Sequence, residues 1–194
     1  MTVTDPIAGI GLDPAVAQRV YRDMLAALAR PGLEQMLPTT EFPPALLPAL
    51  ALADLETGVA VLEAGAPRWL EVLTVATGAP AVAPDRARFV TVLRDVTPEE
   101  LRGARRGTAL APESGATVVC EVRSLRGGRT VELTGPGVKE VETISPQGFH
   151  DAVWRARNDA TADFPAGVDL LLVADDGSMI GIPRTTRVVA VKEM

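Results

Sequence analysis

The clearest candidate for binding an anion is the short run Pro183-Arg184-Thr185-Thr186. A planar guanidinium can hold two oxygens of a phosphate or phosphonate at once, and the two hydroxyls that follow can donate further hydrogen bonds. The same arginine could instead pair with Glu113 or with another acid across a subunit contact. Because ion pairs account for most arginines of this kind, we expect a structural role for Arg184.

Glu113 is the second candidate, because it lies between Pro112 and Ser114 just before an expected strand. A carboxylate there could cap backbone N–H groups, pair with an arginine, or act as a general base. The sequence offers no partner for acid–base chemistry, so the structural roles are favoured. Ser114 lacks the Gly-x-Ser-x-Gly spacing of a nucleophile elbow and is interpreted as a turn residue.

Metal and nucleotide sites of the common kinds are not predicted. Cys120 and His150 are the only cysteine and histidine, and Cys120 falls on the apolar side of its strand, where a small buried side chain is expected. No glycine-rich run ends in Gly-Lys-Ser/Thr, and no Gly-x-Gly-x-x-Gly follows a strand. We therefore expect no metal ligands and no catalytic residues.

The composition is that of one soluble domain. The chain has 194 residues, of which 47% are hydrophobic, and a formal net charge of −6, which favours neither nucleic acid nor an anionic membrane as a partner. No apolar run has the length of a membrane span, and the first residues lack the basic and apolar parts of a signal peptide. With a single cysteine as well, we expect a cytoplasmic protein.

Two strands are expected in the middle of the chain, where apolar and polar residues alternate over TVVCEVR (117–123) and RTVELT (129–134). The glycines of the intervening run Ser124-Leu125-Arg126-Gly127-Gly128 predict an antiparallel hairpin. A bend at Gly135-Pro136-Gly137 then ends the second strand.

The remaining patterns predict helices and strands in alternation. Expected helices begin at Asp13-Pro14, Pro67, the capping box 97–100 and Ser145-Pro146; expected strands cover 59–62, 87–93, 139–144, 168–174, 179–183 and 186–191. The segment from Ala45 to Leu55 is apolar on nearly every face, which predicts burial at a subunit contact and hence a dimer or larger assembly. Together these patterns predict a single α/β domain over 1–194, with a mixed sheet flanked by helices.

Several motifs in the same order resemble one known family. The runs YRDMLAALARPG (21–32), GTALAPESGAT (107–117), LTGPGV (133–138), FPAGVDLLL (164–172) and IPRTT (182–186) are similar to the H subunit of the bacterial carbon–phosphorus lyase system for phosphonate breakdown. The resemblance covers nearly the whole chain.

The resemblance implies the fold of the pyridoxal-phosphate-dependent transferases without their cofactor. A Schiff base needs a lysine, and this chain has only Lys139, beside the Gly-Pro-Gly bend, and Lys192, near the C-terminus. Neither lies in a sequence context that would support the cofactor, so we expect no cofactor.

The resemblance also implies a homodimer that joins the G, I and J subunits of a core complex. With the G, I and L proteins, such a subunit is needed to couple a phosphonate to the ribose of ATP, displacing adenine. The product is alpha-D-ribose 1-(methyl)phosphonate 5-triphosphate. The family has no established catalytic residues in this subunit, so an accessory role is implied. The alternatives are a stand-alone phosphonate-binding or sensing module and an independent enzyme of the transferase fold.

Overall fold

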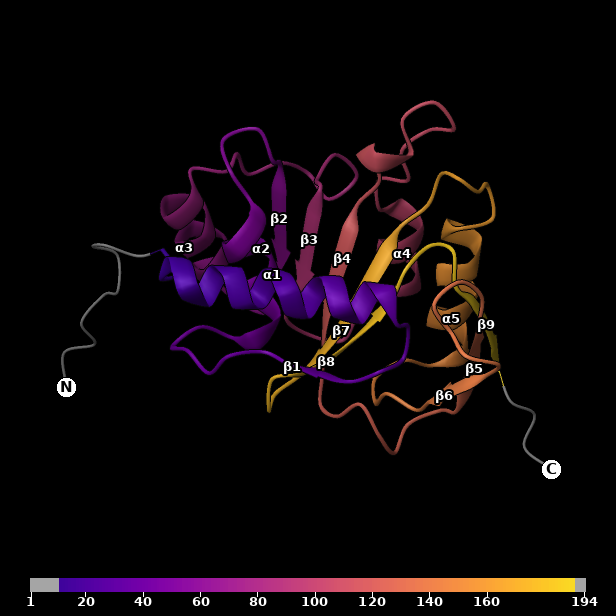
Figure 1. The fold of residues 1–194 in the computed structure, drawn as a ribbon. Coiled ribbons are helices and arrows are strands. Elements are labelled where there is room, and N and C mark those ends of the chain that lie inside the picture. The colour runs from indigo at the N-terminus through magenta and orange to yellow at the C-terminus, as the bar shows by residue number, and fades with distance from the viewer. Residues whose placement is uncertain (1–10, 191–194) are drawn as a thin grey trace.

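A six-stranded mixed sheet forms the centre of the computed structural model, which describes residues 11–190 (Figure 1). The strand order is β1-β8-β7-β4-β3-β2. The bounds are β1 (Gln35–Met36), β8 (Ser178–Ile182), β7 (Asp169–Ala174), β4 (Thr117–Val122), β3 (Phe89–Val92) and β2 (Val59–Leu62). Strands β2, β3, β4 and β7 are parallel, whereas β8 runs antiparallel to β7 and to β1.

Helices cover both faces of this sheet. On one face lie α1 (Pro14–Ala29), the 3-10 turn η1 (Pro44–Leu46), α2 (Leu47–Leu52) and α3 (Arg68–Thr77); in Figure 1, α1 crosses in front of the strands. On the other face lie α4 (Pro98–Gly103) and α5 (Asp151–Ala160), which contact each other. The chain therefore has the expected α/β architecture of a mixed sheet flanked by helices.

Two apolar cores, one on each face, follow from the alternation of side chains along the strands. On β7, Leu170 and Leu172 enter the core beneath α4 and α5, whereas Leu171 and Val173 enter the core beneath α1 and α2. All four are fully buried. A strand buried on both faces is typical of a parallel sheet covered by helices.

A second, three-stranded antiparallel sheet packs beside α5. Its order is β6 (Glu142–Ile144), β5 (Val131–Thr134) and β9 (Arg187–Ala190). The side chains of Val131, Leu133 and Val188 bury this sheet against the core that α4 and α5 cover. The chain therefore contains two sheets rather than the single sheet that the sequence predicted.

The predicted hairpin between residues 117–123 and 129–134 is wrong. β4 lies inside the large sheet between β3 and β7, and β5 belongs to the small sheet. The glycine-rich run pairs instead with residues 145–147: the N–H of Gly128 donates to the Ser145 carbonyl at 2.7 Å. A Cβ at position 128 would lie only 2.1 Å from the Pro146 carbonyl oxygen, so glycine is required there for close approach and not for a hairpin turn.

Several helix starts are confirmed, and one is wrong. The carboxylate of Asp13 accepts from the N–H of Ala15, and Thr97 with Glu100 forms the predicted capping box. The helix expected at 145–146 starts only at Asp151, because the backbone of 145–147 hydrogen-bonds to the loop after β4. The strand expected over 139–144 is reduced to β6, because Glu140 has a positive φ of 62°, which is outside the range of a strand.

The apolar segment Ala45–Leu55 is covered mainly by its own chain. Ala45, Leu46, Leu47, Ala49 and Leu50 are buried in the core on the α1 face, where η1 contacts β4 and β7. Among its apolar residues, only Leu55, at its end, is strongly exposed. This segment therefore gives no reason by itself to expect a dimer. None of the helices within 11–190 is both long and apolar enough to cross a membrane.

Candidate functional site

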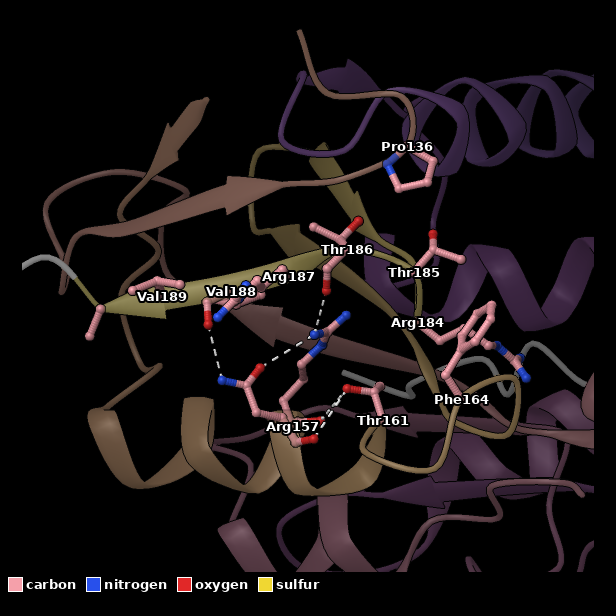
Figure 2. Close-up of a pocket in the computed structure, with 12 residues that line it drawn as sticks. Pro136, Arg157, Thr161, Phe164, Arg184, Thr185, Thr186, Arg187, Val188 and Val189 are labelled. Carbon is pink, nitrogen blue, oxygen red and sulfur yellow. Dashed lines mark hydrogen bonds between the residues drawn. The ribbon is translucent and has the colours of Figure 1, made fainter. Parts of the chain in front are cut away.

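A pocket of about 720 Å³ lies between the C-terminal half of α5 and strand β9 (Figure 2). Arg184, Thr185 and Thr186 all line it, so the structure brings three of the four candidate residues together. The fourth, Glu113, is exposed in the 3-10 turn η2 (Pro112–Ser114) and is not part of the pocket lining. In Figure 2 the side chain of Arg157 rises from α5 toward Thr186.

Arg184 is held in a structural ion pair, as the sequence favoured, but its partner is Asp169 at the start of β7. Its Nη2 lies 2.6 Å from Oδ2 of Asp169, and its backbone N–H donates to Oδ1 at 2.7 Å. The other nitrogen, Nη1, donates to the carbonyl of Pro112. The side chains of the pair are only 14% and 20% exposed. Arg184 therefore joins the loop after β8, the start of β7 and η2.

Arg157 is a fully buried cation beneath the pocket, with only 1% of its surface exposed. Its guanidinium donates to the carbonyls of Thr186 and Pro183, both at 2.7 Å, and more weakly to the side chain of Asn158. All three acceptors are uncharged. Burial lowers the pKa of Arg157 to about 10, and the negative charge of Asp169 opposes that shift. Asp169 is already bound by Arg184, so one carboxylate serves two buried or half-buried arginines.

Two buried polar atoms at this site have no hydrogen-bond partner among the described residues. They are Nε of Arg157 and Oγ1 of Thr186, and both side chains are more than nine-tenths buried. Buried polar atoms without a partner are uncommon in folded proteins and cost free energy. At the outer edge of β9, the backbone carbonyl of Val188 does have a partner: it accepts a hydrogen bond from the side chain of Asn158 at 3.0 Å.

The pocket between α5 and β9 and the carboxyl ends of the parallel strands carry opposite charge. The pocket between α5 and β9 is lined by three arginines, and no described residue that lines it is acidic. At the carboxyl ends of β2, β4 and β7, a smaller cavity of about 380 Å³ is lined by the carboxylates Glu63, Glu121 and Asp175. Burial raises the pKa of Glu121, and the charge of Asp175 raises it further. The carboxyl ends of such strands are where open α/β sheets most often bind ligands, but here that edge repels anions.

The other residues singled out in the sequence lie apart from the pocket. Cys120 is fully buried in β4, as expected, and burial raises the pKa of its thiol well above the usual range. His150 is exposed just before α5, and Lys139 is exposed in the loop between β5 and β6. Lys192 lies outside the described residues. Within 11–190, no three His, Cys, Asp or Glu side chains gather as a metal site would require.

Sequence reasoning missed Asp169 and Arg157, which bind Arg184 and the carbonyl of Pro183 in the loop after β8. Asp169 begins an otherwise apolar strand, and nothing local distinguishes it from a strand-end residue facing solvent. Arg157 did carry a signal. It lies four residues after Val153 and three before Ala160, on the buried stripe of α5, where a charged residue must find partners.

Comparison with known proteins agrees with the resemblance in the motifs. The family model described as bacterial phosphonate metabolism protein (PhnH) matches residues 9–189. A protein of Rhizobium meliloti (strain 1021), named alpha-D-ribose 1-methylphosphonate 5-triphosphate synthase subunit PhnH, is 33% identical over 93% of this chain and 94% of its own length. A protein of Stutzerimonas stutzeri, named putative C-P lyase subunit protein HtxG, is 38% identical over 43% of each chain.

Proposed function

The chain belongs to the PhnH family of bacterial phosphonate metabolism proteins, and from this premise we propose that it is an accessory subunit of a carbon–phosphorus lyase system. With partner subunits it would be needed to form alpha-D-ribose 1-(methyl)phosphonate 5-triphosphate from ATP and a phosphonate. The observation that carries the proposal is the likeness to the Rhizobium meliloti synthase subunit, which extends over nearly the full length of both chains.

The chemistry of the described residues supports an accessory role. The thiol of Cys120 is buried and its raised pKa keeps it protonated, so it is a poor nucleophile. Arg184, the best anion-binding candidate in the sequence, is committed to Asp169 and to the Pro112 carbonyl. Neither the Cys120 thiol nor the Arg184 guanidinium is therefore available for catalysis.

We further propose that the chain forms a homodimer and joins the G, I and J subunits of a core complex. Both relatives are named as subunits, which supports association with other chains. The surface offers apolar side chains for such contacts: Leu110 is 99% exposed in the loop between α4 and η2, which projects from the top of the molecule in Figure 1. A partner chain that covered Leu110 would remove its apolar surface from water, which favours association.

Two further proposals come from the sequence, the first from its family resemblance and the second from its composition. The fold is that of the pyridoxal-phosphate-dependent transferases without the cofactor, and the protein is cytoplasmic. The exposed position of Lys139, away from the pocket, supports the absence of a Schiff base. Added pyridoxal phosphate should therefore produce no absorbance band of an internal aldimine. Borohydride reduction that attaches the cofactor covalently to Lys139 or Lys192 would contradict the proposal.

Co-purification tests the proposed assembly. An affinity-tagged copy of the full chain, expressed together with the G, I and J subunits, should retain them through a salt wash and size-exclusion chromatography. The chain alone should elute and sediment as a dimer. Recovery of the tagged chain without any of these subunits would refute its membership of the complex, and a monomer at micromolar concentration would refute the dimer. Replacing Leu110 by Ser is a matched surface variant that should weaken the assembly without changing the melting temperature.

A further inference from the structure

The pocket between α5 and β9 has an unbalanced positive charge in a protein that is negative overall. Its lining includes Arg157, Arg184 and Arg187, and Asp169, which does not line it, is bound to Arg184. Arg187 is exposed and, within 11–190, has no ion-pair or hydrogen-bond partner for its side chain. Among the described residues, the guanidinium of Arg157 therefore has only uncharged hydrogen-bond partners, and that of Arg187 has none.

A second cavity shows how arginines and acids are arranged where the charges are balanced. That cavity, of about 420 Å³, is also lined by three arginines, Arg86, Arg88 and Arg105, but Glu56 and Asp85 lie beside them. Arginines beside acids in this way are what a solvated surface ordinarily presents. In the pocket between α5 and β9, the acids that would neutralise the arginines are not among the described lining residues.

Besides its charge, the pocket has buried polar groups and a volume that suit a ligand. Arg157 lies under it with its charge in a low-dielectric environment, where Coulomb attraction is screened less than at the surface. Nε of Arg157 and Oγ1 of Thr186 are buried and lack partners within residues 11–190, and Thr185 is exposed nearby. The volume of about 720 Å³ is within the range of small-molecule sites.

One wall of the pocket is apolar. The ring of Phe164 is 65% exposed and Val189 is 47% exposed, and both line the pocket together with Pro136. Figure 2 shows Phe164 beside Arg184, across the pocket opening from the strand. An exposed aromatic ring at the edge of a cationic pocket suits a ligand with an anionic end and a flat or apolar body.

We infer that this pocket binds a small molecule bearing a phosphoryl or phosphonyl group. Arg187 and Thr185 contact the anion, the buried charge of Arg157 attracts it, and Phe164 packs against the rest of the ligand. The choice of phosphonate and nucleoside triphosphate as ligands rests on the proposed function. The position of the pocket is independent of the proposed function. The pocket lies near Asp169, at the amino-terminal end of β7, and away from the acidic carboxyl ends of the strands.

Calorimetric titration of the full chain with ATP, methylphosphonate and inorganic phosphate tests the inference. At least one should bind at sub-millimolar concentration. Loss of one charge-assisted contact in Arg187→Ala should weaken binding about tenfold or more. Arg86→Ala, the matched control at the second cavity, should leave affinity unchanged. Phe164→Ala should weaken ATP more than phosphate if the source is a nucleotide, and should affect all three equally little if only the anion is held.

Three outcomes would overturn the inference: no binding of any probe at millimolar concentration, unchanged binding in Arg187→Ala, or equal weakening in Arg86→Ala. Loss of the partner subunits from Arg187→Ala, with ligand binding intact, would mean that the pocket is a protein interface. The proposed function is tested separately, by co-purification of the wild-type chain. A chain that binds the anion but no partner subunit would refute the proposed function and would still support anion binding in the pocket.

Discussion

Replacing Arg184 by alanine should destabilise the fold because its guanidinium joins three segments that are distant in sequence. The substitution removes the paired hydrogen bonds to Asp169 and the bond to the Pro112 carbonyl, and leaves the Asp169 carboxylate, 20% exposed, with only the backbone N–H of Arg184. A hydrogen bond to a charged group contributes about 1.5–3 kcal/mol, and breaking a buried pair costs about 3–5 kcal/mol. Because this pair is partly exposed, we expect a loss of about 2–4 kcal/mol.

The expected loss is large enough to measure by thermal or urea denaturation. In a domain of this size, each kcal/mol lowers the melting temperature by about 2–4 °C, so the variant should melt roughly 4–16 °C below the wild type. The melting temperature of Arg184→Lys should lie between those of Arg184→Ala and the wild type, because lysine keeps the charge but loses the planar guanidinium. A double-mutant cycle with Asp169→Asn should show coupling of more than about 1 kcal/mol.

Arg126 provides the matched control. It forms the same kind of pair with Glu34 at 2.9 Å, but the two side chains are 79% and 42% exposed. Exposed pairs contribute about 0–1 kcal/mol, so Arg126→Ala should change the melting temperature little. If Arg184→Ala is no more destabilising than Arg126→Ala, the structural role assigned to Arg184 is wrong.

Two further predictions concern other elements. Burial raises the pKa of Glu121, so its ionised form costs stability; that cost is present when the pH is above its folded pKa and disappears as the pH falls below the usual glutamate pKa. Glu121→Gln should therefore raise the melting temperature at pH 7 and leave it unchanged near pH 3, and a gain of equal size at both values would contradict this reasoning. Thr97 caps α4 by accepting from the N–H of Glu100. Thr97→Ala should cost about 1 kcal/mol in denaturation, whereas Thr97→Ser should keep most of the stability.

Local signals in the sequence were sufficient for most helices and strands, but not for the choice of strand partners. The alternation in 117–123 correctly predicted β4, and the capping residues Asp13 and Thr97 correctly predicted helix starts. Which strand lies beside β4 depends on contacts between segments far apart in the chain. The glycines after β4 favoured a hairpin, yet the close approach of Gly128 to Pro146 is what requires them.

The pocket could be predicted only in part, for the same reason. Three lining residues are adjacent in sequence, so the motif that singled out Arg184 also included Thr185 and Thr186. Arg157 and Asp169 reach the same place only through the packing of α5 and β7 against the loop after β8. A charged residue on a buried helical stripe indicates that such a contact exists, but not with which partner it is made.

The most direct test of the proposed function is an omission experiment on the reconstituted reaction. The purified partner subunits are incubated with ATP and methylphosphonate, with and without this chain, and release of adenine is followed together with formation of the ribosyl phosphonate triphosphate by phosphorus NMR. An accessory subunit predicts product only when the chain is present, and full restoration when the purified chain is added back. Product formation at the same rate without the chain would contradict the proposed function.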